Sequence, residues 1–476
     1  MKIKPKNLFS HSLMAGAIVS LLASSQLIHA QKVQPVRDVA ISLGDSFISG
    51  EGAEDFISGD GAMSYEGTPP TDLFNNNNSM DVYFCHRSEN ALIKVAQLPG
   101  IDDKYNFACS GADPINLNRR NRSHRNPDGT FLESQVRSVR GISEDNTNHI
   151  RLIHVGMGAN NSINNFGSLL TYCHGIFMAD AAGGIGANGL DFTINVLGAE
   201  TRVDIDGAEE SITNVVGNRP NVQEALNRNG CIAQDFYRTN ELNQITDEYE
   251  TGLERLITVM AGDGYGPNAK EWKLVIQGYA TPFAPNPHAS FFRANGKRDT
   301  RKRFAGLARK RYAAGCPMHW LSLQQSDDMA QILSNIAQDV VARLRNNHPN
   351  LDIVYMDVEN AFNGGRLCET AQSPAGALFN PIWSRKTSDN QIAKTIPAGG
   401  RIFANQWKNI ISGCSSDLGG SHARCQDAAH PNEDGHAVMG RCLTATVAFS
   451  NAENGSNDVA CTRNASTGAI TVGRLN

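Results

Sequence analysis

The chain has 476 residues, of which 40% are hydrophobic, and a formal net charge of -5. This length is enough to bury one large core or two smaller ones. The slight acidity argues against a nucleic-acid partner, because no surplus of Lys and Arg is available to neutralise phosphates.

Residues 1–30 have the pattern of a secretory signal peptide. Three lysines lie among the first six residues, an apolar run covers 13–22, and Ala30 is the expected cleavage position. The run is shorter than the roughly 20 apolar residues that a membrane span requires, so an uncleaved anchor is the less favoured alternative. We therefore predict a secreted or periplasmic protein whose mature chain covers 31–476.

Export changes what the ten cysteines indicate. The chain has no Cys-x-x-Cys pair, which disfavours a zinc or redox site. An even number of cysteines in an exported protein favours disulfides. The sequence does not settle their connectivity, but chain order suggests Cys85–Cys109, Cys173–Cys231, Cys316–Cys368, Cys414–Cys425 and Cys442–Cys461.

Apolar runs without alternation predict parallel strands that are covered on both faces. Between them, Ser88 is a candidate cap for a helix that starts at Glu89, and a second helix begins near Ser326 and ends at His348. A last helix is expected over 434–449. Strands and helices that alternate in this way favour an open α/β sheet. The five expected strands are 39–43, 105–109, 151–155, 273–277 and 352–356.

Three regions exceed what such a sheet needs: 165–265, 284–318 and 374–424. Long connections of this kind are usually elaborations near a site, or disordered. The second is basic and carries aromatic residues, so contact with an anionic membrane surface is an alternative to the favoured solvated loop. Residues 204–210 resemble a calcium loop only faintly, and we favour a solvated turn because the full set of oxygen ligands is missing.

The chemistry begins at the end of the first expected strand, in Gly44-Asp45-Ser46. Ligands of open parallel sheets bind beyond the carboxyl ends of the strands, and a serine there needs a base to become a nucleophile. His430 is the candidate base, with Asp427 three residues before it to orient the imidazole. We predict that Ser46, His430 and Asp427 form a catalytic triad.

Two further strand ends offer donors for an oxyanion. Gly111 follows the second strand and Asn160 the third, although Asn160 alone could also be a helix cap. Together with the amide of Ser46, the Gly111 amide and the Asn160 side chain would stabilise a tetrahedral intermediate.

These blocks, GDSF, SGAD, GANN and DAAHP in this order, resemble those of the SGNH hydrolases, also called GDSL lipases or esterases. The likeness covers about 38–450 apart from the three long regions. CHRSENAL, FACSGA and IQGYATPF are similar to companion motifs of the extracellular bacterial branch. The resemblance implies an α/β/α sandwich with a flavodoxin-like, five-stranded parallel sheet, and a disulfide between Cys85 and Cys109 beside the site.

Two segments depart from the family pattern. The third block usually reads Gly-Gly-Asn-Asp but is Gly158-Ala159-Asn160-Asn161 here, so the support expected from the acid is altered. A later landmark, usually Gly-His followed by an acid and a cysteine, reads Gly-Gly-Arg-Leu-Cys over 364–368.

The sequence thus predicts an exported serine esterase that cleaves carboxylic esters, with lipid esters implied by the resemblance, and without a metal or organic cofactor. A carbohydrate O-acetylesterase and an acyltransferase would use the same residues. A secreted binding protein that retains an inactive hydrolase fold is the alternative from another class.

Overall fold

In a computed structural model of the chain, the structure describes residues 36–53, 55, 85–120, 132–160, 239–266, 271–291, 310–311, 314–316, 318, 320–373, 375–379, 429–452 and 458–475. The signal peptide predicted at 1–30 lies outside these residues, as do most of the three long regions.

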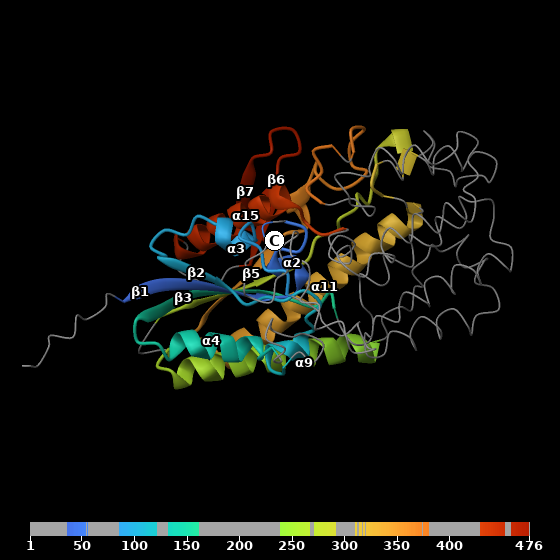
Figure 1. Cartoon of the computed structure of the whole chain (residues 1–476). Helices are drawn as coiled ribbons and strands as arrows, with labels where there is room; N and C mark the ends of the chain where they lie inside the picture. Colours follow the sequence, from blue (N-terminus) through green and yellow to red (C-terminus); the bar gives the residue numbers. More distant parts are fainter. Residues whose placement is uncertain are drawn as a thin grey trace, which may run out of the picture.

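A seven-stranded sheet of order β2-β1-β3-β4-β5-β6-β7 forms the centre of the molecule (Figure 1). All neighbouring strands run parallel except β6 and β7, which pair antiparallel. Continuous burial of β4 fits a strand that is covered on both faces. The strands are β1 Arg37–Gly44, β2 Asp103–Asn106, β3 Asn148–Gly156, β4 Lys273–Gln277, β5 Asp352–Asp357, β6 Val459–Arg463 and β7 Ile470–Arg474.

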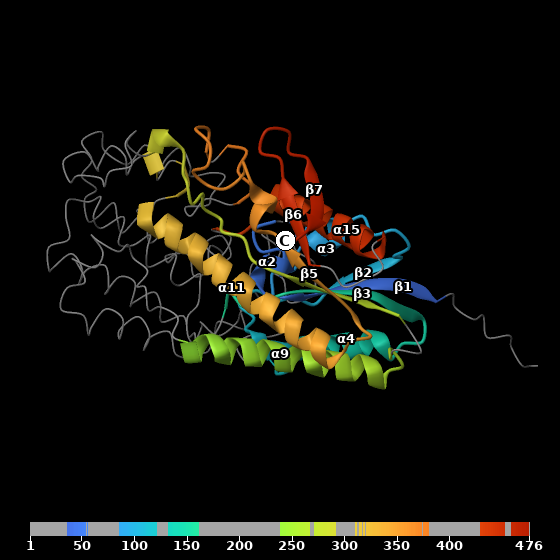
Figure 2. The same ribbon diagram turned by 180° about the vertical axis from the view of Figure 1, so that it is seen from behind.

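Helices cover both faces of this sheet, which gives three layers (Figures 1 and 2). On one side lie α4 (Gln135–Ser143), α9 (Thr239–Gly262) and α11 (Trp320–Asn347); on the other lie α3 (Leu92–Val95) and α15 (Glu433–Ala452). The apolar stripe of α11 faces the core: Met329, Leu333, Val340 and Leu344 are all buried. The expected α/β sandwich is confirmed.

The sheet is larger than the five strands expected, because β6 and β7 extend it beyond β5. β2 is also displaced: it pairs with β1 over Asp103–Asn106, whereas 107–109 already belong to the loop that follows. The helix expected after Ser88 is only the single turn α3, and Ser88 caps a turn instead, accepting from the backbone N–H of Asn90.

Two helices, α11 and α9, differ from what the sequence predicted. α11 begins at Trp320 rather than near Ser326, and it ends at Asn347, one residue before the predicted His348. α9 falls within 165–265, so the end of that region supplies one of the covering helices. The described residues also form the short helix α2 (Ser46–Ser49) and three 3-10 helices: η2 Pro114–Leu117, η3 Ala289–Phe291 and η4 Glu359–Phe362.

Three of the five disulfides suggested by chain order are present: Cys85–Cys109, Cys316–Cys368 and Cys442–Cys461. The last joins α15 to β6 and so fixes the final helix to the added edge of the sheet. The remaining four cysteines lie outside the described residues.

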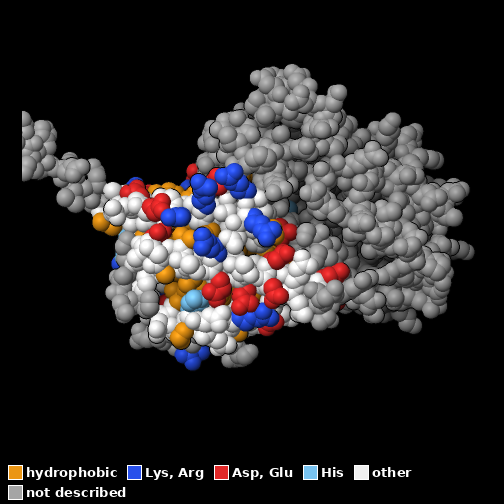
Figure 3. Space-filling view, turned by 90° about the horizontal axis from the view of Figure 1, so that it is seen from below, with side chains coloured by type: hydrophobic (Ala, Val, Ile, Leu, Met, Phe, Trp, Pro, Cys, Tyr) orange, Lys and Arg blue, Asp and Glu red, His pale blue; other side chains and the backbone are white. Residues whose placement is uncertain are grey.

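The face seen from below, the side of α4 and α9 in Figure 1, carries basic and acidic side chains interspersed (Figure 3). Ion pairs such as Arg140–Glu144 and Arg343–Asp247 account for part of this mixture. None of the helices in the described ranges is both long and apolar enough for a membrane span.

Candidate active site

The candidate site lies where the order of the sheet reverses. The chain leaves β1 toward β2 on one side and continues to β3 on the other, and the last residues of β1 and β3, Gly44 and Gly156, are paired in register. Such a switch point leaves a crevice beyond the carboxyl ends of the two strands, where open α/β sheets bind their ligands.

Ser46 occupies the first position of the short helix α2 (Ser46–Ser49), which follows β1 directly. Asp45 is the N-cap: its carboxylate accepts from the Phe47 N–H at 3.1 Å. Gly44 makes the turn with a φ of 148°, and a Cβ there would lie 2.2 Å from the carbonyl oxygen of Gly156. Only glycine fits this close approach. The turn at Gly44 places Ser46 outside the strand.

Gln135 of α4 holds the same turn from the other side. Its side-chain amide accepts from the Gly44 N–H and donates to the Gly44 carbonyl, both at 2.7 Å. Gly44 is therefore bonded to the helix layer through the buried side chain of Gln135.

His430 lies next to Ser46 although 384 positions separate the two residues. The Nε2 atom of His430 is 2.8 Å from the Oγ of Ser46, which is a hydrogen-bond distance. The ring of Phe47 packs against the imidazole at 5.8 Å between centroids. A nucleophile and a base at this separation are the minimum that nucleophilic catalysis by a serine requires.

Asn432 positions the loop that carries His430. Its side chain donates to the Ala377 carbonyl at 2.9 Å and accepts from the Gly435 N–H at 2.9 Å, which caps the start of α15. Pro431 forms an isolated bridge with Phe379. Ala429 has a φ of 62°, a left-handed conformation that costs a residue with a Cβ about 1–2 kcal/mol.

Asp427, the predicted third member of the triad, lies outside the described residues. Its role stays a prediction.

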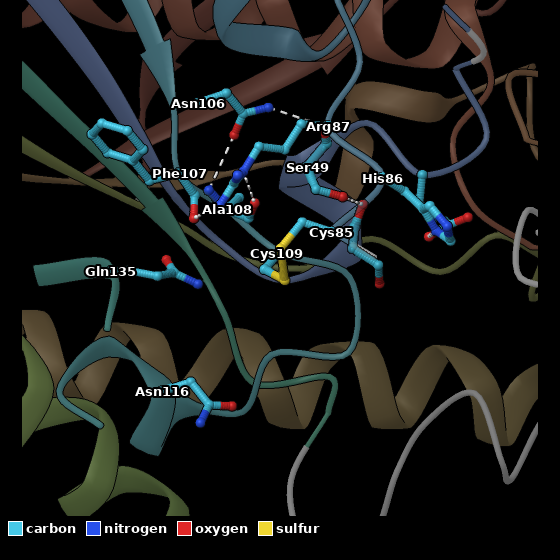
Figure 4. Close-up of a disulfide and its surroundings, with 12 residues drawn as sticks. Ser49, Cys85, His86, Arg87, Asn106, Phe107, Ala108, Cys109, Asn116 and Gln135 are labelled. Carbon is cyan, nitrogen blue, oxygen red and sulfur yellow. Dashed lines mark hydrogen bonds and ion pairs between the residues drawn. A yellow bond between two sulfur atoms is a disulfide. The ribbon is translucent and has the colours of Figure 1, made fainter. Parts of the chain in front are cut away.

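Gly111 lies in the loop after β2, two residues after Cys109, whose disulfide with Cys85 is shown in Figure 4. It has a φ of 73°, and the loop before it adjoins the nucleophile turn, because the Cys109 N–H donates to the Gly44 carbonyl at 3.0 Å. Arg87 holds the same loop by donating to the Ala108 carbonyl at 2.9 Å. This arrangement puts the Gly111 segment at the same edge of the sheet as Ser46.

Asn160 ends the described part of the loop after β3. The residue before it, Ala159, donates its N–H to the Asp45 carboxylate at 3.3 Å. The structure thus brings the loops of Ser46, Gly111 and Asn160 to one edge of the sheet.

Sequence reasoning missed a buried ion pair near Ser46. Glu51 follows α2, and its carboxylate lies 2.6 Å from Nδ1 of His86; the two side chains are 0% and 6% exposed. Burial alone would raise the pKa of Glu51, but attraction by His86 and His430 holds it below the ordinary value. The only sequence signal was that His86 belongs to the CHRSENAL motif.

A second missed residue is Tyr279, in the loop after β4. Its phenol donates to the Asp45 carboxylate and accepts from the Ala159 N–H at 3.2 Å. Burial raises the pKa of Asp45 to about 6, although these hydrogen bonds oppose the shift. The IQGYATPF motif contains Tyr279, but nothing in the sequence gave its partners.

Residues 364–368, the altered landmark, lie between the β4 exit and the His430 loop. The Leu367 N–H donates to the Pro282 carbonyl at 2.9 Å, and the Leu378 N–H donates to the Gly365 carbonyl at 2.7 Å. The segment 364–368 is therefore bonded to the stretch before Phe379, the residue that forms an isolated bridge with Pro431.

Among the described residues, no group of three or more His, Cys, Asp and Glu side chains has the arrangement of a metal site. The segment expected to resemble a calcium loop, 204–210, lies outside them.

Comparisons with known proteins find only distant similarity to this chain. No family model and no curated protein matches the sequence. Solved structures similar to this one include an extracellular lipase from Streptomyces rimosus, with 14% identity, a TM-score of 0.34 and coverage of 87% of this chain and 99% of that one. An aryl esterase from M. smegmatis has 10% identity and a TM-score of 0.28 over the same shares of the two chains. At this distance neither neighbour carries a function to this chain, which must be argued from its own side chains.

Proposed function

We propose that the protein is an exported serine hydrolase that cleaves carboxylic esters through an acyl-enzyme. The observation that carries this proposal is the 2.8 Å contact between Nε2 of His430 and Oγ of Ser46, at the topological switch point of the sheet. Ser46 is 6% exposed, so its hydroxyl is largely withdrawn from water, and electrostatic interactions are stronger in such a place.

In the first half-reaction, His430 takes the proton of Ser46 as Oγ attacks the ester carbonyl. The amides of Ser46 and Gly111 and the side chain of Asn160 stabilise the oxyanion of the tetrahedral intermediate. The intermediate collapses, the carbon–oxygen bond to the alcohol breaks, and His430 gives its proton to the leaving oxygen. Asp427 orients the imidazole and stabilises its charged form.

In the second half-reaction, His430 removes a proton from water, which attacks the acyl-enzyme carbonyl. Collapse of the second intermediate releases the acid and returns the proton to Ser46. Every proton that His430 accepts is thus returned within the cycle, and the residues need no cofactor for these steps.

Lipid esters are the substrate class we propose, on the resemblance of the sequence blocks to extracellular lipases and esterases. The base lies against buried apolar rings: Phe47 packs against His430, and Phe379 lies 6.2 Å from Phe47 between ring centroids. Export is supported by the leader pattern of 1–30 and by the three disulfides, because disulfides persist in oxidising compartments.

Hydrolysis of p-nitrophenyl esters of increasing acyl length by the wild type and by Ser46→Ala tests this function. Removal of the nucleophile is expected to lower kcat by about a thousandfold or more. Ser49→Ala is the matched control, since Ser49 lies in the same helix and is also buried; it should retain activity within a few-fold.

The panel also separates the alternatives. Activity limited to acetyl esters would indicate an O-acetylesterase, and ester products formed with an added alcohol would indicate an acyltransferase. A fluorophosphonate probe that fails to label Ser46 in the folded wild type would favour a binding protein. Equal hydrolysis by wild type and Ser46→Ala would end the serine mechanism.

A further inference from the structure

A fully buried carboxylate, Asp45, receives hydrogen bonds from the exits of three different strands. Its donors include the Phe47 N–H at 3.1 Å, the Ala159 N–H at 3.3 Å and the Tyr279 phenol. These residues follow β1, β3 and β4 in turn. An ionised group without water contact is costly in a protein interior unless its partners compensate for the lost hydration.

We propose that Asp45 and Tyr279 are positioning residues for the reaction, which hold the loop of Asn160 in register with the nucleophile Ser46. The inference rests on the proposed function, because it assigns these residues a role through the oxyanion donor Asn160.

On the nucleophile side, Asp45 fixes Ser46 through the main chain. The Asp45 carbonyl accepts from the N–H groups of Ile48 and Ser49 at 3.1 and 2.9 Å, and its own N–H donates to the Gly156 carbonyl at 3.2 Å. The Asp45 carboxylate also caps the helix by accepting from the Phe47 N–H. Together these bonds fix the orientation of the first turn of α2.

On the oxyanion side, the Asp45 carboxylate and the Tyr279 phenol share one donor. The Ala159 N–H lies 3.3 Å from the carboxylate oxygen and 3.2 Å from the phenol oxygen. Since Ala159 directly precedes Asn160, this shared bond limits where the Asn160 amide points.

Tyr279 is itself held by α11. The Tyr279 N–H donates to Oγ of Ser334 at 2.8 Å, and Ser334 Oγ donates to the Tyr279 carbonyl at 3.1 Å. The Tyr279 ring also packs against Phe47 at 5.7 Å between centroids. Burial raises the pKa of the Tyr279 phenol well above the ordinary value, so it keeps the proton that it donates to Asp45.

The test is Tyr279→Phe, which removes the hydroxyl and keeps the ring on Phe47. We expect kcat for ester hydrolysis to fall at least tenfold with little change in KM, because a displaced donor weakens stabilisation of the transition state more than binding of the substrate. Tyr265→Phe is the matched control: its hydroxyl is also buried, but it accepts from the Ile150 N–H, in the amino-terminal half of β3. This control should retain kcat.

A double-mutant cycle with Asn160→Ala distinguishes a positioning role from a merely structural one. It compares the loss of kcat caused by Tyr279→Phe in the wild type and in the Asn160→Ala background. If Tyr279 acts through Asn160, then Tyr279→Phe costs little further activity in the Asn160→Ala background. Asp45→Asn, which keeps the size of the side chain but removes its charge, should show the same non-additive loss. Circular dichroism checks that each variant is folded.

Retention of kcat within twofold by Tyr279→Phe, or an equal loss in both backgrounds, would overturn the positioning role while the esterase stands. If the wild type shows no hydrolysis that depends on Ser46, the proposed function itself fails and this inference fails with it.

Discussion

Glu51 and His86 form a buried pair beside the catalytic candidates. The Glu51 carboxylate is 0% exposed and interacts electrostatically with His430, and the Glu51 N–H donates to the Ser46 carbonyl at 3.3 Å. His436 of α15 also interacts electrostatically with His430. A negative charge at this place favours the imidazolium that forms during proton transfer.

Replacement of Glu51 by glutamine removes that charge and nearly keeps the size of the side chain. Protonated His430 then loses an attraction, so we expect the acid limb of the kcat/KM profile to move to lower pH by about half a unit or more. The pH profile of ester hydrolysis measures the shift. Glu144→Gln on α4, which loses a pair with Arg140 on the surface, is the control and should leave the profile unchanged.

An acid limb that stays in place in Glu51→Gln would show that the Glu51–His86 pair serves folding alone.

The sequence singled out Ser46 and His430 as candidates and gave no role to the buried residues packed around them. Ser46 and His430 stood out because each belongs to a block with a recognisable role, and the structure places them in contact. Glu51 and Tyr279 carried no such mark, since an isolated acid or tyrosine between apolar neighbours looks the same whether or not it is paired. Only the folded chain brings Tyr279 to Asp45 across 234 positions.

At the scale of elements, the ends of β1 and β3 approach more closely than any side chain allows. A Cβ on Gly44 would lie 2.2 Å from the Gly156 carbonyl oxygen, which is backbone and has no rotamer by which to move away. Gly100 offers a comparison, because it has a φ of 78° but nothing within 4 Å of the place of its Cβ. Comparing Gly44 with Gly100 therefore separates the steric clash of an added Cβ from the cost of a positive φ.

Gly44→Ala should therefore cost about 3 kcal/mol or more of unfolding free energy, and Gly100→Ala only about 1 kcal/mol, the cost of the left-handed conformation alone. Urea unfolding of the two variants measures the difference. Similar losses would mean that the turn before Ser46 relaxes freely.

β1, β3, β4 and β5 were predictable because their largely continuous burial leaves an unbroken apolar run. β6 and β7 were missed because they lie at the edge and are partly exposed, so their sequences alternate with polar residues. β2 was placed too late in the chain: its partner register on β1 ends at Asn106, while the apolar run continues into the loop that holds Cys109. The long polar stretch before α9 concealed the start of a covering helix.

At the scale of the whole molecule, two buried histidines make stability depend on pH. Burial lowers the pKa of His154 to about 4 and that of His436 to about 3, from an ordinary value of 6.5. His154 is held between Ser42 and Gln277, with ring nitrogens 2.8 and 3.1 Å from their side chains. The unfolded chain binds protons at these groups below about pH 6.5, whereas the folded chain does not.

Stability is thus complete above pH 6.5 and declines as the pH falls toward 4, with a loss of about 2 kcal/mol at pH 5 from each histidine. Urea unfolding at pH 7.5 and pH 5 measures the decline. His154→Gln removes one titrating group, so its two values should lie closer together than those of the wild type, whatever its absolute stability. An unchanged gap would show that other groups set the acid sensitivity.

The 384 positions between Ser46 and His430 also have a consequence for synthesis under the proposed mechanism. A ribosome makes the chain from its amino end, so the Ser46 hydroxyl is synthesised long before the His430 imidazole. On that mechanism a growing chain has no base for its serine until the segment before α15 has been made and has docked, and a chain that stops ahead of His430 would not hydrolyse esters.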